Sequence, residues 1–235
     1  MPPLNVIFTL GLIAYLGGAA AGLAGFRAPH RARIVSFAFA LSGALLETAA
    51  AVVTLTQGAS ATWNLPSGVA LFAWTVRVNA LSAYFNLALG ILATAVSIYS
   101  FGYLRPTAER RNAGVLGFFY NVLLLSLTLV FAAGNVFIFL VAWEAMALSA
   151  YCLVSFEHEK AATRRAGMVF LIMSHAGTGM LLLAFMILAK AAGSLDFANF
   201  HLLASRLPAW EQGAVFVLFF FGFGVKAGII PVHVW

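Results

Sequence analysis

The stretch 114–156 constrains this chain more than any other part of it, because it holds a single charged residue, Glu144. One helical span of a bilayer needs about 20 consecutive apolar residues. The stretch is long enough for two spans, and a turn signal at Gly134 and Asn135 divides it. Soluble domains are about one quarter charged, whereas this chain of 235 residues is 9% charged and 63% hydrophobic. The sequence therefore predicts an all-α integral membrane protein.

Apolar runs along the whole chain predict about seven transmembrane helices. The runs cover 4–25, 34–56, 80–102, 114–133, 135–156, 166–189 and 212–235. The seventh is expected to be broken. Gly222, Gly224 and Gly228 weaken it around Lys226, and Pro231 removes a helical backbone donor. The alternative interpretation of these glycines is a face for close helix packing.

Two loops are expected to hold structure of their own. Between the second and third runs, Trp74, Val76 and Val78 alternate with polar residues, which predicts a small β-hairpin on the outer side. After the sixth run, Ser194 or Asp196 is expected to cap a short helix. The apolar face of that helix would suit the membrane interface.

Positive side chains gather in three short loops, which determines the expected orientation. Cytoplasmic loops carry an excess of Lys and Arg. Nine of the 13 such residues follow the first, third and fifth runs: Arg27, Arg31, Arg33, Arg105, Arg110, Arg111, Lys160, Arg164 and Arg165. We therefore expect a multi-pass protein of the cytoplasmic (inner) membrane with its N-terminus outside. The same loops account for the net charge of +6, so the expected partner is the lipid bilayer and no nucleic acid.

Three charged residues lie deep within predicted spans: Glu47, Glu144 and Lys226. A charge at the bilayer centre costs about 2.5–3.5 kcal/mol by insertion scales, so such residues need partners and commonly mark ion pathways. Glu144 and Lys226 are interpreted as counter-charges on a proton path. At about 4 Å they would attract by about 4 kcal/mol at an effective dielectric of about 20, enough to decide whether the lysine keeps its proton. Glu47 is either a further intramembrane polar site or a packing hydrogen bond.

Two histidines are candidates for the same path. His175, in the sixth run, has an imidazole that can relay protons near neutral pH. The alternative is a structural hydrogen bond from the ring to a backbone carbonyl. His233, which follows Pro231, would extend the relay.

Cofactor chemistry is not expected in this chain. The sequence has no ligand spacing for haem, iron–sulfur or zinc and no nucleotide-binding glycine motif. Its single cysteine, Cys152, excludes a disulfide framework. We therefore expect no catalytic residue, metal or cofactor, and at most a non-catalytic role within an oxidoreductase.

Four stretches together resemble a known family of membrane subunits. They read GNVFIFLVAWEAMALSAYCLVSFE, SHAG, GSLDFANF and FGFGVKAGIIPVHVW. They are similar to the antiporter-like subunits of respiratory complex I, Mrp-type cation/proton antiporters and membrane-bound hydrogenases. Within that group the chain is most similar to the large membrane subunits of hydrogenase-4 and formate hydrogenlyase.

The resemblance implies a proton-translocating module without a redox centre of its own. The family pairs a glutamate on the fifth helix with a lysine on the seventh, which match Glu144 and Lys226. His175 matches the sixth-span histidine of this branch. Asn79 stands where the family commonly has aspartate, so no charge role is implied there. The implied partners are other membrane subunits, and the implied ions are protons, with other cations as an alternative.

The resemblance also implies a division of the chain. Residues 1–113 would form an N-terminal three-helix segment, and 114–235 the start of the antiporter-like repeat. The family continues beyond the point that matches Trp235, so the chain is expected to be an N-terminal fragment of a longer product. The leading hypothesis is a proton-translocating subunit of a hydrogenase-4 or formate hydrogenlyase complex. The alternatives are an Mrp-type antiporter component, a complex I pumping subunit, and a structural fragment that conducts nothing.

Overall fold

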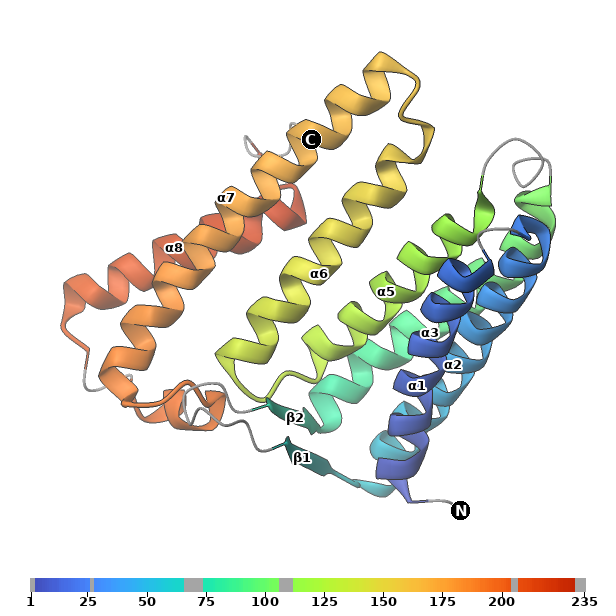
Figure 1. The fold of residues 1–235 in the computed structure, drawn as a ribbon. Helices are drawn as coiled ribbons and strands as arrows, with labels where there is room; N and C mark the ends of the chain where they lie inside the picture. Colours follow the sequence, from blue (N-terminus) through green and yellow to red (C-terminus); the bar gives the residue numbers. More distant parts are fainter. Residues whose placement is uncertain (1–2, 26–27, 66–73, 106–111, 204–206, 231–235) are drawn as a thin grey trace. The chain divides into compact units, whose positions relative to one another are not determined.

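The computed structural model describes the chain except for residues 1–2, 26–27, 66–73, 106–111, 204–206 and 231–235 (Figure 1). The long helices are α1 (Leu4–Ala24), α2 (Pro29–Gln57), α3 (Ala80–Tyr103), α5 (Ala113–Phe131), α6 (Val136–Val154), α7 (Ala161–Ala192) and α8 (Ala209–Ala227). Two strands, β1 (Ala61–Leu65) and β2 (Trp74–Val78), pair in one sheet. Short 3₁₀ helices follow α6 and α7, at Ser155–Glu157 (η3) and Phe197–Leu202 (η4).

Six of these helices are long and apolar enough to cross a membrane, which confirms the all-α membrane class. They are Leu4–Ala24, Pro29–Gln57, Ala80–Tyr103, Ala113–Phe131, Val136–Glu157 and Ala161–Ala192. The sequence predicted about seven spans, and six such helices are found among the described residues. The seventh predicted span corresponds to α8, which carries Glu211 and Lys226 and ends at Ala227. Gly228 has φ 76°, so the helix stops at a left-handed glycine, as the prediction of a broken seventh helix requires.

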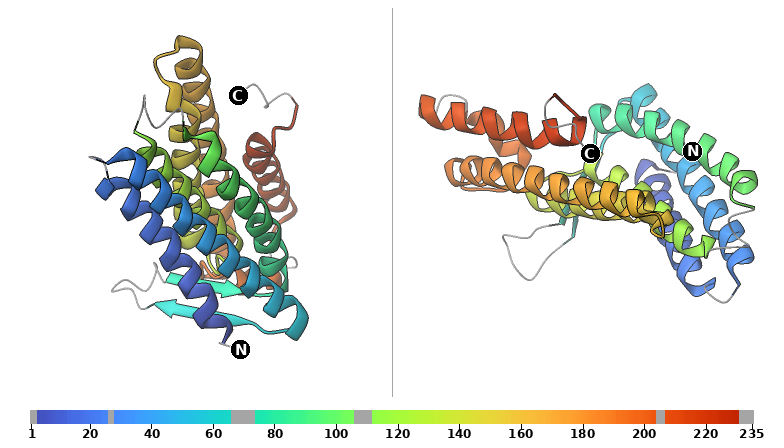
Figure 2. Two further views of the ribbon diagram at one scale, coloured as in Figure 1. Left: turned by 90° about the vertical axis from the view of Figure 1, so that its right-hand side faces the viewer. Right: turned by 90° about the horizontal axis from the view of Figure 1, so that it is seen from above.

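The chain forms two compact units by its internal contacts. The first unit comprises Met1–Thr62 and Arg77–Ala132, and the second comprises Trp63–Val76 and Ala133–Trp235. In the first unit α1, α2, α3 and α5 pack side by side (Figure 2). Small residues allow close approach there: a Cβ atom on Gly22 would lie 2.5 Å from the Gly114 carbonyl oxygen. The predicted division into 1–113 and 114–235 concerned the translocation repeat and stays a prediction.

The break between α5 and α6 lies where the Gly-Asn signal predicted it. The Asn135 side chain accepts a hydrogen bond from the Ile138 amide at 2.9 Å and so caps α6. The Gly134 amide donates to the Thr75 carbonyl at 2.9 Å. A Cβ atom at position 134 would lie 2.6 Å from the Thr75 Cγ2 atom, so this contact with the predicted hairpin requires glycine.

In the second unit, α7 packs against both α6 and α8. Its buried centre consists of Val136, Leu181 and Phe185. The predicted short helix is η4, and Asp196 caps it by accepting from the Ala198 amide at 2.8 Å. Phe197 and Phe200 pack against the buried centre. The apolar side chains of η4 therefore cover the protein core.

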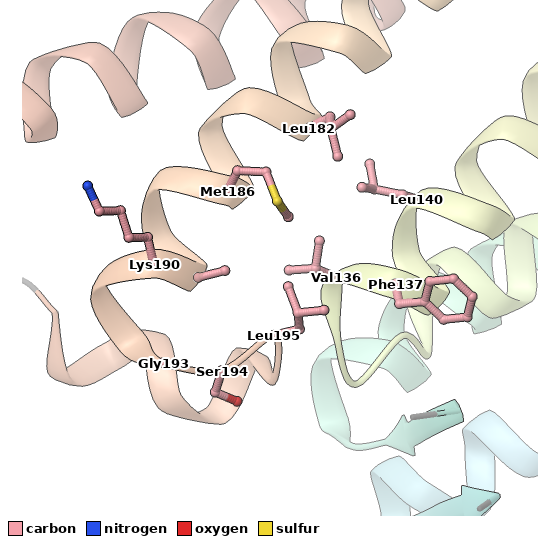
Figure 3. A pocket seen from close by; sticks show the side chains of 10 residues that line it. Val136, Phe137, Leu140, Leu182, Met186, Lys190, Gly193, Ser194 and Leu195 are labelled. Atoms are coloured by element: carbon pink, nitrogen blue, oxygen red, sulfur yellow. The ribbon is translucent and has the colours of Figure 1, made fainter. Parts of the chain in front are cut away.

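A cavity of about 500 Å³ lies between the start of α6 and the end of α7 (Figure 3). Its lining is almost wholly apolar and includes Val136, Leu140, Leu182 and Met186. Figure 3 shows the Lys190 ammonium directed away from these side chains. Among the described residues that line it, none therefore presents a proton-handling group to the cavity, and the candidate site lies elsewhere in this unit.

Candidate functional site

The side chains of Glu144 on α6 and His175 on α7 meet in the second unit. His175 Nε2 lies 3.3 Å from Glu144 Oε2, and the two side chains are 49% and 29% exposed. Packing of α6 against α7 brings these two helices together. An acid and an imidazole, both identified as candidates from sequence, therefore form one site.

The second ring nitrogen of His175 determines how many protons this contact holds. His175 Nδ1 lies 3.0 Å from the Leu171 carbonyl oxygen, one turn earlier on α7. A carbonyl oxygen can only accept, so Nδ1 carries the hydrogen of this bond. In a neutral ring Nε2 then has only a lone pair, as does an ionised carboxylate. The contact between Nε2 and Glu144 therefore requires one proton, on one side or the other.

Lys226 lies near this pair but does not contact it directly. Its Nζ atom is buried and has no hydrogen-bond partner among the described residues. The ammonium lies 5.1 Å from the ring centre of Phe170 and 5.7 Å from that of Trp143, the residue before Glu144. The Glu144 carboxylate attracts the Lys226 charge from a distance. The predicted counter-charges are thus separate, and His175 stands in contact with the acid.

Two features make the position of Lys226 tolerable for a cation. Aromatic ring faces attract cations within about 6 Å. Lys226 also lies in the last turn of α8, where the partial negative charge of the helix end stabilises positive groups. These interactions stand in for the hydrogen bonds that the Nζ atom lacks within the described ranges.

A close glycine contact positions α8 against α7. A Cβ atom on Gly177 would lie 3.0 Å from the Gly222 carbonyl oxygen, and one on Gly222 would lie 2.7 Å from Leu181 Cδ2. Gly177 follows His175 by two residues, and Gly222 precedes Lys226 by one turn. The packing interpretation of the α8 glycines therefore holds together with the helix break at Gly228.

The remaining predicted site residues lie elsewhere. Glu47 lies on α2 in the first unit and is 2% exposed, and His233 lies outside the described residues. Sequence reasoning missed Trp143, Phe170 and the Leu171 carbonyl. The four-residue spacing from Leu171 to His175 is the signal for the ring-to-backbone bond, whereas no sequence pattern indicated the two aromatic rings. Within the described ranges, no group of three or more His, Cys, Asp or Glu is placed to hold a metal ion.

Comparisons with known proteins agree with this architecture. Residues 133–235 match the family described as NADH:quinone oxidoreductase/Mrp antiporter, TM. Hydrogenase-4 component B of Escherichia coli is 38% identical over 68% of this chain. Formate hydrogenlyase subunit 3 of the same organism is 30% identical over 86% of it. The matches cover 23% and 32% of those two proteins, so the chain spans about a quarter to a third of their length.

A solved structure shares the fold. The membrane-bound sulfane sulfur reductase, an archaeal respiratory membrane complex, contains a chain that superposes with a TM-score of 0.78 at 19% identity. The superposition covers 99% of this chain and 46% of that one.

Proposed function

Because residues 133–235 belong to the NADH:quinone oxidoreductase/Mrp antiporter transmembrane family, we propose that this chain translocates protons as the antiporter-like part of a membrane oxidoreductase subunit. We assign it to the hydrogenase-4 and formate hydrogenlyase type. The names of its two bacterial relatives support that choice. Its partners are other membrane subunits of such a complex, the lipid bilayer and the transported protons.

The observation that carries the proposal is the 3.3 Å contact between His175 and Glu144. The Lys226 ammonium lies near this contact and makes no hydrogen bond to any described residue. One proton is shared across the contact. A partner subunit that shifts Lys226 toward Glu144 stabilises the carboxylate and drives the proton onto His175. Moving the ammonium away returns the proton to Glu144. Charge movement elsewhere in the complex is thereby converted into proton transfer, since opposite charges at close range favour the ionised acid.

The test is proton pumping by the full-length protein in its assembled complex. We expect Glu144→Gln to abolish acidification of inverted membrane vesicles, because glutamine keeps the size and polarity of the side chain but cannot titrate. Glu159→Gln, which removes an exposed carboxylate between α6 and α7, is the matched control and should pump normally. Co-purification with the hydrogenase subunits separates lost pumping from lost assembly. A normal pumping rate in an assembled Glu144→Gln complex contradicts the proposal.

The same experiment separates this proposal from the cation/proton antiporter that the family name also includes. An antiporter component would exchange protons for sodium or potassium without any redox substrate. We expect pumping that depends on redox turnover and does not depend on these cations. Cation-driven exchange in the absence of turnover would favour the antiporter instead.

A further inference from the structure

Glu47 presents a buried carboxyl group that the proposed proton path does not use. The residue is 2% exposed, and neither carboxyl oxygen has a hydrogen-bond partner among the described residues. It lies on α2 in the first unit, outside the segment 133–235. A buried, unpartnered carboxylate is strongly destabilised relative to the neutral acid. Whether Glu47 carries a proton therefore determines what this residue can do.

The carboxyl group of Glu47 packs directly against α1. Gly11 and Tyr15 lie four residues apart on α1, and Gly43 and Glu47 lie four apart on α2, so each pair shares one helix face. A Cβ atom on Gly11 would lie 2.3 Å from Glu47 Oε1, and one on Gly43 would lie 2.6 Å from the Tyr15 ring. Each glycine thus makes room for the large side chain of the opposite helix. Because the two helices pack this closely, no space is left beside the Glu47 carboxyl group on the side of Gly11.

The described groups around Glu47 are hydroxyls, and none of them is a base. Tyr15 is fully buried. The charges of Glu47 and Tyr120 act on its hydroxyl, and the hydroxyl of Thr128 on α5 lies close enough to influence it. The hydroxyl oxygens of Tyr15 and Thr128 are buried and make no hydrogen bond to the described part of the chain. Among the described residues, no basic side chain makes a hydrogen bond to either carboxyl oxygen of Glu47. The carboxyl group is therefore not part of an ion pair with any of them.

We propose that Glu47 is a second proton-binding site, in which the side chain is a neutral carboxylic acid that shares internal water with the hydroxyls of Tyr15 and Thr128. A proton neutralises the carboxylate without needing any volume, which suits the closed side at Gly11. Buried waters commonly complete the hydrogen bonds of otherwise unsatisfied polar groups. Because no described residue makes a hydrogen bond to either carboxyl oxygen, none stabilises the ionised form in this way. The proton therefore stays bound to Glu47, whereas the proton of the Glu144–His175 contact moves.

Infrared spectroscopy of the full-length protein in lipid vesicles tests this site directly. We expect a protonated-carboxyl C=O band at mildly alkaline pH that shifts in D₂O. The band should be lost in Glu47→Gln, unchanged in Glu159→Gln, and shifted in Tyr15→Phe, which removes one hydroxyl from the site. Identical spectra for the wild type and Glu47→Gln would overturn the proposal. A band that appears only when sodium is withdrawn would also overturn it, because the ligand would then be a metal cation.

Melting temperatures of a double-mutant cycle test whether the Glu47 carboxyl group packs against Gly11 in the folded protein. Gly11→Ala places a methyl group on Glu47 Oε1 and should lower the melting temperature, as should Glu47→Ala. The double variant should melt higher than the sum of the two losses predicts, because the methyl group then occupies the vacated space. Gly102→Ala, where an added Cβ atom meets nothing within 4 Å, is the control. If the two decreases in melting temperature are strictly additive, the Glu47 carboxyl group does not pack against Gly11.

Discussion

The three charged side chains that the sequence placed deep within spans lie in three different environments. Glu144 contacts an imidazole that can take its proton. Lys226 lies against aromatic faces at a helix end. Glu47 has neither a base nor a hydrogen-bond partner in the described part of the chain. The environment of each residue, more than its type, decides whether it can exchange a proton.

A first prediction concerns His175. We expect His175→Gln to reduce proton pumping by about a hundredfold or more, because a positioned side chain that accepts a proton contributes about 10²–10⁴-fold to a proton-transfer step. Glutamine can still donate to Glu144 but cannot accept the proton. His201→Gln, at an exposed ring on η4, should pump like the wild type. If His175→Gln assembles and pumps normally, the ring-to-backbone bond is its whole role.

At the scale of elements, the sequence predicted where helices begin and end better than how they meet. The Gly-Asn break, the Asp196 cap and the stop at Gly228 all follow from local backbone chemistry. The contact of Glu144 with His175 does not. It depends on how α6 and α7 are each rotated about their axes where they pack together. Hydropathy runs do not contain these rotations, so the sequence could name Glu144, His175 and Lys226 as candidates but could not predict which of them are in contact.

The glycine crossing gives an element-scale prediction with an internal control. Gly177→Ala places a methyl group 3.0 Å from the Gly222 carbonyl oxygen. It should destabilise the full-length protein by about 1–3 kcal/mol through overpacking. Gly179→Ala lies on the same helix and meets nothing within 4 Å, so it should stabilise by about 0.5–1 kcal/mol through helix propensity. Thermal unfolding in detergent measures both. Equal effects of the two changes would mean that α7 and α8 do not meet at Gly177.

At the scale of the whole molecule, membrane physics made the fold class predictable. Lipid offers no hydrogen bonds to a backbone, so long apolar runs must be helices. The division of the chain into two compact units was harder to predict from the sequence, because the boundary between Ala132 and Ala133 falls inside one apolar stretch. Orientation across the bilayer rests on the distribution of Lys and Arg and stays a prediction. Placement in the cytoplasmic membrane is part of the same proposal.

Cysteine labelling tests that orientation. In a Cys152→Ser background of the full-length protein, we expect Ser60→Cys to react with an impermeant maleimide from outside intact cells. Ala161→Cys, at the first residue of α7 beside the basic residues that follow α6, should react only after the membrane is opened. Both positions are exposed, so accessibility to the reagent distinguishes the two sides. The reverse pattern would place the N-terminus in the cytoplasm.

The hydrogen bond from His175 to the Leu171 carbonyl sets the timing of any relay through this ring. A proton accepted at Nε2 can leave only by the same atom while Nδ1 is held by the helix backbone. Onward passage therefore requires the imidazole to turn once for each proton. Breaking a neutral hydrogen bond costs about 0.5–1.5 kcal/mol net, and exposed side chains turn within picoseconds to nanoseconds. In the proposed relay, rotation of the His175 ring would therefore be far faster than the microsecond-to-millisecond motions of catalytic cycles and would not limit the rate of proton transfer.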